Sequence, residues 1–592
     1  MSVWKHFCRF RIIALAMILS PAAGEEPPYD YGEAQEFWAF QPPLSVSLES
    51  TSSEWARKKA DYFVLKRLEK NGLQPNSEAD SHALLRRVSY DLTGLPPDWE
   101  SMRDLPYEEQ VKRLLRSPHF GERWARLWLD VARFAEDQAH IVGNNSSLTY
   151  PNAYRFRDWV IEALNRDLPY DDFLRQQLAA DLIAPDNESM HQALGFMGLG
   201  PKYYRRGDLA VMADEWEDRV DTLTRGVMGL TVACARCHDH FYDPIPTSDY
   251  YALAGVFAST EMFNRPLVDD CEMQKDGNTK KPDDAEHLVR EAKEMKDLPV
   301  FDRGDISSPG PKVERGFLTV LGRGERTTFS KENSGRLDLA NEIASPKNPL
   351  TARVWVNRVW GELFGQPLVS TTSNFGKLGE KPTHPELLDD LSWRFMHEGN
   401  WSLKWLVEEI VLSATYRQSS ELAAEKARKD PANESLWRMN RRRLPVEMWR
   451  DSLFTATGDL DRTVGGPSFN VSNPNSNRRA VYASISRLQL DPMLALFDFP
   501  DPNLHSPFRS ETTTPIQKLF VMNHPLLVNR ARALASRMTG SPADSIEKGY
   551  ELLFGRSPEP DERQLGLTYL KENSLEDYAQ ALLSLNEFAW LD

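Results

Sequence analysis

Apolar residues recur at helical spacing along most of the chain, and this pattern predicts a mainly α-helical protein. The clearest early example runs from Ala60 to Leu68, where Phe63 and Val64 add to one apolar stripe. Stretches rich in proline and glycine, such as Gly94-Leu-Pro-Pro97, separate the segments. Further helices are expected over residues 83–92, 107–115, 123–134, 153–164, 171–182 and 209–230.

The helical periodicity returns in the second half of the chain. The segment 349–364 carries an apolar stripe and is followed by Gly365, a residue that suits a helix stop. Thr383-His-Pro-Glu386 has the spacing of a capping box with proline inside the first turn, so we expect a helix to begin there. The best strand candidate is short and alternates Val481, Ala483 and Ile485.

Between the two helical halves the chain changes character. Charged residues, glycine and proline dominate residues 269–312, a composition typical of a connection between domains. Part of it, 285–296, has the pattern of a solvated helix. We therefore expect two helix-rich domains with a few short strands, over 25–268 and 313–592, joined by a charged linker that contains proline and glycine.

The first 24 residues have the layout of a secretory signal peptide. Basic residues precede an apolar run from Ile12 to Leu19, and the small residues 22–24 follow it. The run is shorter than the roughly 20 apolar residues that a helical membrane span needs. We expect residues 1–24 to be removed on export, and the mature chain to reach the periplasm or the cell surface without a membrane span.

Composition narrows the classes of function. The hydrophobic fraction of 41% is sufficient for packed cores, and the formal net charge of -16 argues against general attraction to nucleic acid or anionic lipid. No phosphate-binding loop, dinucleotide fingerprint or serine elbow occurs in a fitting context. Nucleotide use and acyl transfer are therefore disfavoured.

The cysteines point to a specific cofactor. Cys8 belongs to the signal peptide, which leaves Cys234, Cys237 and Cys271 in the mature chain. Two residues separate Cys234 from Cys237, and His238 follows at once. This is the spacing of c-type haem attachment, in which the thiols form thioether bonds and the histidine binds the iron. The segment predicts one covalent haem c on Cys234, Cys237 and His238, with His238 as the iron ligand.

Two other interpretations of this segment stay open. Cys234 and Cys237, with His238 or with His240 as an alternative metal ligand, could contribute to a site for zinc or another metal, although zinc sites usually bring a second ligand pair. The two thiols could instead form a disulfide or a redox-active pair.

A row of acidic residues lies just upstream. Asp214, Asp218, Asp221 and Arg225 share one face of the expected helix, and Glu217 lies beside them. So close to the cysteines, these candidate catalytic residues could hold a cation, tune an iron centre or act in proton transfer. A solvated helix face stabilised by ion pairs is the simpler interpretation.

Several longer stretches, taken together, resemble two known protein domains. The first half contains Trp38-Ala-Phe-Gln-Pro-Pro43, residues 84–97, Arg157-Asp-Trp159, Cys234-Ala-Arg-Cys-His-Asp-His240 and Asp243-Pro-Ile-Pro246. These resemble the planctomycete cytochrome-associated domain of unknown function. The second half contains residues 348–353, 356–360, 382–386, 413–419 and 497–502. These are similar to its usual companion, the planctomycete surface-associated domain.

The resemblance covers nearly all of the mature chain. It implies an exported protein of the Planctomycetota or Verrucomicrobiota type, from bacteria that degrade complex polysaccharides. The expected function is c-type haem-dependent redox chemistry in the envelope, with a redox protein as partner and a carbohydrate as a candidate substrate of an oxidoreductase. The alternatives are a non-haem metal enzyme that acts on carbohydrate through the acidic row, and a non-catalytic envelope scaffold that binds glycans.

Overall fold

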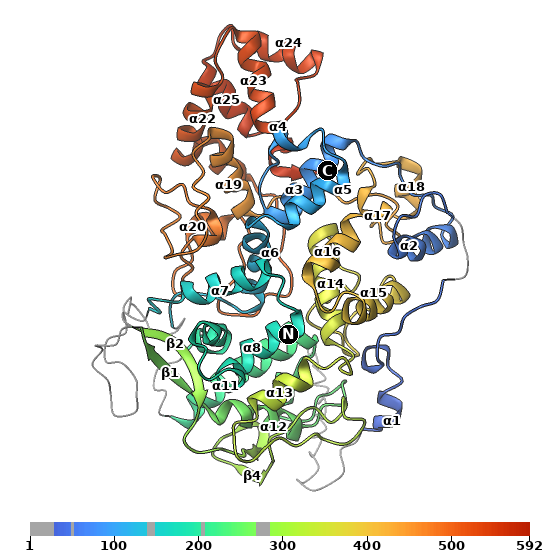
Figure 1. The fold of residues 1–592 in the computed structure, drawn as a ribbon, viewed down its shortest axis with the longest axis vertical. Coiled ribbons are helices and arrows are strands. Elements are labelled where there is room, and N and C mark those ends of the chain that lie inside the picture. Colours follow the sequence, from blue (N-terminus) through green and yellow to red (C-terminus); the bar gives the residue numbers. More distant parts are fainter. Residues whose placement is uncertain (1–28, 49–52, 139–148, 203–207, 268–284) are drawn as a thin grey trace, which may run out of the picture.

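The computed structural model describes residues 29–48, 53–138, 149–202, 208–267 and 285–592. The expected signal peptide, 1–24, and Cys271 lie outside these residues. Within them the protein is mainly α-helical, with short strands in two-stranded sheets, as the periodicity predicts (Figure 1). None of the described helices combines the length and the apolar character that crossing a bilayer requires.

The helices expected in the first half are confirmed. The segment 107–115 coincides with α5 (Tyr107–Leu115), and the long segment 209–230 begins as α11 (Leu209–Leu223). Their apolar stripes face a common core, which explains why periodicity identifies them. The helices of this half are α1 (Tyr31–Ala34), α2 (Lys59–Lys70), α3 (Ser81–Thr93), α4 (Trp99–Met102), α5, α6 (His119–Val131), α7 (Tyr154–Asn165), α8 (Tyr170–Ile183), α9 (Glu188–His191), α10 (Gly195–Gly198), α11 and α12 (Thr247–Ala258).

The second half is helical as well. Gly365 ends α14 with φ +69°, in the left-handed region that favours glycine, so the expected helix stop is confirmed. The helices are α13 (Arg336–Ile343), α14 (Thr351–Phe364), α15 (Pro385–His397), α16 (Leu403–Val411), α17 (Ala414–Arg417), α18 (Ala424–Lys429), α19 (Val446–Thr457), α20 (Pro492–Leu496), α21 (Pro515–Asn523), α22 (Pro525–Arg537), α23 (Pro542–Phe554), α24 (Pro560–Tyr569), α25 (Leu575–Leu583) and α26 (Asn586–Ala589).

The described strands form antiparallel pairs. β1 (Thr260–Pro266) pairs with β2 (Ala285–Glu291) along its whole length, with Thr260 opposite Glu291. The other pairs are β3 (Pro299–Phe301) with β4 (Pro309–Lys312), and β5 (Arg442–Arg443) with β6 (Trp590–Leu591).

Two local expectations are wrong. Residues 285–291 form the buried strand β2 instead of a solvated helix, because β1 supplies backbone hydrogen bonds and α10 packs against the strand. The strand expected at 481–485 is absent from the described secondary structure: Ala480–Tyr482 form a 3₁₀ turn, and Ala483 makes a single bridge to Phe469. In both cases tertiary partners decide a conformation that local pattern left ambiguous.

The capping box expected at the start of α15 is also wrong. The N-cap residue is His384, and no side chain accepts a hydrogen bond from the first helical N–H groups. The hydroxyl of Thr383 instead lies 3.0 Å from His384 Nδ1. Glu386 turns to an ion pair with Lys66 of α2, at 2.7 Å. With His384 as the N-cap residue, Glu386 is the second helical residue instead of the third, which the capping box requires.

The hydrophobic cores divide the chain near residue 440. One core runs from Ala39 to Met439 and includes Val481 and Tyr482, whereas the second is built mainly from residue 444 onward. Trp355 of α14 stacks on Tyr170 of α8 with ring centroids 4.3 Å apart, and so joins the two halves. The stretch 269–312 therefore does not separate two cores, although the domain bounds themselves stay a prediction.

The end of the chain returns to the first half. β6 pairs with β5 within the second half, whereas Arg87 of α3, in the first half, donates to the backbone oxygen of Asp592 at 2.6 Å. Arg86 donates to the backbone oxygen of Glu587, also at 2.6 Å. These buried arginines fix α26 and the residues that follow it to α3, where the C label stands in Figure 1.

Candidate functional site

The Cys-x-x-Cys-His segment, residues 234–238, follows an irregular end of α11. The helix widens into a π-helical turn over Thr224–Met228, a feature often found at functional sites. Gly229 then takes φ +61°, and a Cβ on it would lie 2.8 Å from the ring of Phe375. Only glycine fits both the backbone angle and the close approach, so this residue lets the chain turn into the segment.

A 3₁₀ turn over Val232–Arg236 separates the thiols from the core. In this type of helix, residues three apart lie one above the other. Val232 and Ala235 are fully buried and form the inner face of the turn. Cys234 and Cys237 are also three apart, and both are exposed, free thiols. Two thiols on the outward side suit two thioether bonds to one porphyrin.

The imidazole of His238 is held in one tautomer. Its Nδ1 lies 2.7 Å from the backbone oxygen of Asp239, which can only accept, so Nδ1 carries the proton. Nε2 therefore has the lone pair, and no hydrogen-bond partner for it occurs among the described residues. The ring packs against Phe241 with centroids 4.1 Å apart. This is the tautomer that a metal-binding histidine needs.

His240 has a different environment. Its Nδ1 accepts the backbone N–H of Asp243 at 2.9 Å, so Nε2 carries the proton and lies 3.0 Å from the Thr231 hydroxyl oxygen, which accepts. The residue is buried, and burial lowers its pKa although the Asp243 carboxylate acts in the opposite direction. Both ring nitrogens are thus engaged in holding the loop. The geometry favours His238 over His240 as a metal ligand.

The acidic row on α11 contacts the segment through Arg236, which stands between the two cysteines. Arg236 donates to Asp214 at 2.8 Å and also to Glu217. Burial lowers the pKa of Arg236, but these hydrogen bonds outweigh it and raise the pKa above its usual value. The two acids therefore anchor the side of the 3₁₀ turn that faces neither the core nor the thiols.

The other members of the row also pair with arginines. Asp218 accepts two hydrogen bonds from the buried Arg133, at 2.8 and 2.5 Å. Asp221 accepts from Arg225, one turn along the helix, at 2.7 Å. Burial raises the pKa of Asp221, and Arg225 opposes that shift. Each acid thus has a cationic partner within the protein, which favours the ion-pair interpretation of the row over a cation site.

A hairpin that connects β3 and β4 passes close to one side of Cys237. Gly304 takes φ +74°, and a Cβ there would lie 2.9 Å from Cys237 Sγ. Arg303 also has a positive φ, of 52°. The hairpin lies within 269–312, the stretch whose composition predicts a linker between domains. The hairpin instead forms one wall of the site. The signal available in the sequence was the glycine itself, which marks a close backbone approach.

The residues after the cysteines fix the segment to its surroundings. Asp239 accepts hydrogen bonds from the backbone N–H and the hydroxyl of Thr247, at 2.7 and 3.0 Å, at the start of α12. Asp243 is buried and accepts the backbone N–H of Lys377, from the second half, at 2.7 Å. A Cβ on Gly376 would collide with this carboxylate. The segment is therefore held by both halves of the chain.

A zinc site would need more ligands than the segment offers. Among the described residues, no group of three or more histidine, cysteine, aspartate or glutamate side chains is placed to hold a metal ion. Structural zinc usually takes four such ligands. Within the described residues, the segment therefore lacks the further ligands that a structural zinc site usually has.

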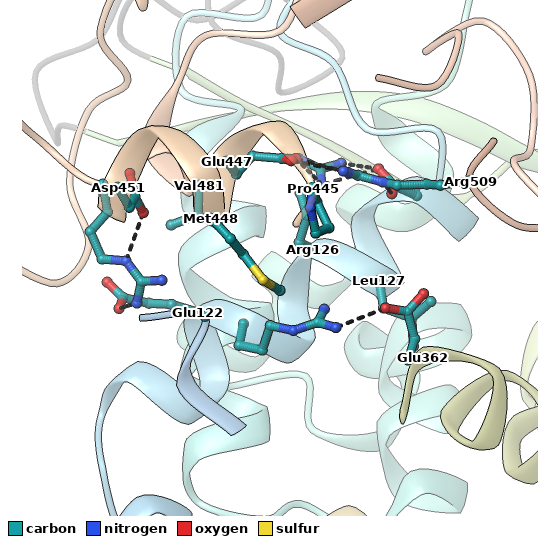
Figure 2. Close-up of a pocket in the computed structure, with 14 residues that line it drawn as sticks. Glu122, Arg126, Leu127, Glu362, Pro445, Glu447, Met448, Asp451, Val481 and Arg509 are labelled. Atoms are coloured by element: carbon teal, nitrogen blue, oxygen red, sulfur yellow. Dashed lines mark hydrogen bonds and ion pairs between the residues drawn. The ribbon is translucent and has the colours of Figure 1, made fainter. Parts of the chain in front are cut away.

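A second candidate site is a small cavity that sequence reasoning missed. It lies between α6, α14, α19 and the loop that carries Arg509, and Figure 2 shows its charged walls. We call it the junction cavity. Its water-accessible volume is about 40 Å³, which is room for a few water molecules but not for an organic substrate. Its charged residues are Glu122, Arg123, Arg126, Asp130, Glu362, Glu447, Asp451, Arg479 and Arg509.

Ion pairs across the junction cavity join the two halves of the chain. Arg123 pairs with Glu362 at 2.8 Å, and Arg479 pairs with Glu122. Arg509 donates to Asp130 at 2.7 Å and to both oxygens of Glu447 at 2.8 Å. The carboxylates of the junction cavity are thus paired with guanidinium groups, which points to a structural role for this cavity.

Two carboxylates of the junction cavity show opposite pKa shifts. Burial raises the pKa of Glu447, but Arg509 and Arg126 outweigh burial and bring it down to about 2. Burial raises the pKa of Asp451, and Arg479 and Arg450 compensate only in part. Such a divergence can mark an acid and a base. Here burial of Asp451 and the arginines beside Glu447 account for it, and the cavity leaves no room for a substrate.

Two family models match the chain. Residues 59–262 match PSCyt2, described as a protein of unknown function (DUF1549). Residues 335–570 match PSD1, described as a protein of unknown function (DUF1553). The Cys-x-x-Cys-His segment lies in the first match, and the junction cavity takes residues from both. No curated protein and no solved structure matches the chain.

Proposed function

Because the chain belongs to the family in which the planctomycete cytochrome-associated domain precedes its companion domain, we propose that it carries one covalent c-type haem and acts in envelope electron transfer. Cys234 and Cys237 would form the thioethers, and His238 Nε2 would bind the iron. When bound, this group supplies one-electron redox chemistry. The observation that carries the proposal is the combination of two outward thiols with a histidine whose tautomer leaves Nε2 open.

Rigid support of the segment favours this function. Ala235 is fixed in the core and Arg236 is fixed to α11, so the two residues between the cysteines are held on separate sides. Hydrogen bonds of His240, Asp239 and Asp243 immobilise the following loop. A site held in this way keeps the thiols and the imidazole oriented without a large entropic cost when the cofactor binds.

The surroundings of the segment offer an apolar surface. Phe241 is 76% exposed and Tyr242 is 52% exposed, and the two residues directly follow His240. Leu378, 59% exposed, follows Lys377, whose backbone N–H binds Asp243, so it emerges close to the same loop. Contiguous exposed apolar patches often mark a site of interaction with a partner or ligand. A porphyrin attached to the neighbouring thiols would cover part of this surface, and an electron-transfer protein would dock at the remainder.

The proposed location is the cell envelope. The signal-peptide layout of residues 1–24 favours export, and covalent haem attachment outside the cytoplasm agrees with it. The substrate proposed for an oxidoreductase role is a carbohydrate, on the strength of the family resemblance. The acidic row is a weaker candidate for carbohydrate chemistry, because Asp214, Glu217, Asp218 and Asp221 are all paired with arginines.

The proposal is tested by covalent haem content. The full chain is expressed in an exporting host that has the haem-attachment machinery, and the product is measured by pyridine haemochrome spectrum, by haem stain after denaturing electrophoresis and by intact mass. We expect one haem per chain, absent from the Cys234→Ala/Cys237→Ala variant and retained in Cys271→Ala, which removes a thiol outside the segment. An unmodified mass for the exported wild type, with stoichiometric zinc by elemental analysis, would overturn the proposal.

A further inference from the structure

Asp239 lies between the two histidines of the segment and makes contacts through both its backbone and its side chain. Its backbone oxygen accepts the Nδ1–H of His238 at 2.7 Å. Its carboxylate accepts the backbone N–H and the hydroxyl of Thr247, at 2.7 and 3.0 Å. Thr247 is the first residue of α12. One residue therefore links the expected iron ligand to the start of a helix.

The N-terminus of α12 takes its side-chain acceptor from Asp239. The N-cap residue of this helix is Pro246, which has no side-chain acceptor of its own. The Asp239 carboxylate accepts the first helical N–H instead, and a negative charge at this end also interacts favourably with the helix dipole. The helix packs against the 3₁₀ turn of the thiols, where the Tyr251 hydroxyl donates to the backbone oxygen of Arg236 at 2.9 Å. Asp239 is thus anchored to the element that supports the cysteines.

The peptide group that accepts the His238 proton is also held at its other end. This group joins Asp239 to His240, and its N–H donates to the backbone oxygen of Ile245 at 3.0 Å. Ile245 is fully buried. Because a peptide group is planar, a fixed N–H also fixes the direction of the carbonyl. The oxygen that orients the imidazole is therefore held by the core as well as by α12.

A fixed acceptor at Nδ1 changes the properties of Nε2. A metal-binding histidine that donates its other N–H to a carbonyl oxygen is a more basic ligand and keeps one ring orientation. A more basic ligand favours ferric over ferrous iron, and such hydrogen bonds are one way in which a protein adjusts the potential of a haem.

The Asp239 carboxylate acts in the same direction as the hydrogen bond, because a negative charge near the iron stabilises its more positive state. Among the described residues, no lysine or arginine forms an ion pair with this carboxylate. In this it differs from Asp214 and Asp218 on α11, which are paired with arginines. The charge of Asp239 is therefore not offset by a cation in direct contact.

We infer that Asp239 is a positioning residue that holds His238 in place and keeps the reduction potential of the site low. This inference rests on the proposed haem. The backbone oxygen of Asp239 orients the imidazole, and the carboxylate anchors that peptide group to Thr247. The charge of the carboxylate adds to the effect of the hydrogen bond.

The test compares Asp239→Asn with Asp239→Ala in the exported full chain with attached haem. Asparagine keeps an oxygen that can accept from Thr247 but removes the charge, whereas alanine removes both. We expect a higher midpoint potential in Asp239→Asn. Asp239→Ala should raise it further and change the electron paramagnetic resonance spectrum of the ferric haem, because the imidazole is no longer fixed. Asp80→Ala removes the carboxylate that accepts from Ala83 at the start of α3, and should leave both readouts unchanged.

A second measurement needs no haem. In the Cys234→Ala/Cys237→Ala background, amide hydrogen exchange over residues 239–250 should be about fivefold faster in Asp239→Ala, the factor that corresponds to ~1 kcal/mol for the loss of a helix N-terminal acceptor. Asp239→Asn should exchange like the parent. Unchanged exchange in Asp239→Ala would show that the carboxylate does not anchor the loop.

The outcomes separate this inference from the proposed function. Equal midpoint potentials in the wild type and both variants overturn the inference, as do equal potentials and spectra in the two variants, and in either case the haem itself stands. An exported wild type without haem overturns the proposed function, and the inference with it. If Asp239→Ala is not exported, Thr247→Ala replaces it, because it removes the hydroxyl bond, and Thr247→Ser should restore the wild-type potential and spectrum.

Discussion

The guanidinium of Arg236 donates to the Asp214 carboxylate at 2.8 Å, which ties the residue between the two cysteines to the helix that precedes them. The same guanidinium also binds Glu217, one turn further along α11. The 3₁₀ turn thus has three faces in different surroundings. One is buried in the core, one is hydrogen-bonded to α11, and one carries the exposed thiols. Removing one of these contacts should alter the site in a measurable way.

Arg236→Gln should lower the free energy of unfolding by about 1 kcal/mol, because it breaks two partly exposed, charge-assisted hydrogen bonds. It should also reduce the covalent haem content of the exported protein, since the turn loses its contact with α11. Urea unfolding and the haem stain measure the two effects. Arg225→Gln, which breaks the partly exposed pair with Asp221 on α11, is the control and should leave haem content unchanged. Equal haem content in both variants would contradict the anchoring role.

Gly304→Ala should have two effects: a free-energy cost of the backbone conformation and a steric contact with the site. Any side chain at φ +74° costs about 1 kcal/mol, and the new Cβ would lie 2.9 Å from Cys237 Sγ. We expect lower haem content and altered reactivity of Cys237 towards a thiol reagent in the haem-free protein. Gly466→Ala is a matched control, because Gly466 also has a positive φ, of 92°, with nothing within 4 Å of its Cβ. Identical thiol reactivity in the two variants would show that the hairpin does not restrict Cys237.

Stability should fall steeply between about pH 6 and pH 4. Burial lowers the pKa of His287 to about 3, and burial with the Arg67 charge does the same for His384. In the unfolded chain both groups titrate near 6.5, so over this interval the unfolded state binds more protons and stability rises with pH. Each histidine contributes about 1.4 kcal/mol per pH unit. Urea unfolding of the wild type and of His287→Gln at several pH values checks this, and the variant should have the shallower slope by that amount.

Glu362→Gln should weaken the junction between the two halves. The change removes the carboxylate partner of Arg123, a buried arginine, and should lower the free energy of unfolding by about 3 kcal/mol. The double variant Arg123→Met/Glu362→Met should recover most of this loss, because no uncompensated charge remains. Additive losses in the double variant would show that the two residues act independently.

Periodicity in the sequence was sufficient to predict most of the helices. The segments around α2, α5 and α14 carry apolar stripes, and burying such a stripe stabilises a helix whatever the neighbour is. The spacing of Cys234, Cys237 and His238 was equally local, so the candidate haem ligands could be identified without the fold. Gly365 was readable for the same reason, because a positive φ at a helix end favours glycine.

Only the tertiary structure decided features that depend on distant partners. Residues 285–291 form a strand because β1 pairs with them. From the sequence alone, the acidic row of α11 could be interpreted as a metal site. In the structure, Arg236 and Arg133 donate hydrogen bonds to its carboxylates. Hydrogen bonds and ion pairs require that two groups meet in space, and sequence spacing fixes such meetings only within a few residues on one helix or turn. The exposure of the thiols and the junction cavity both depend on these longer contacts.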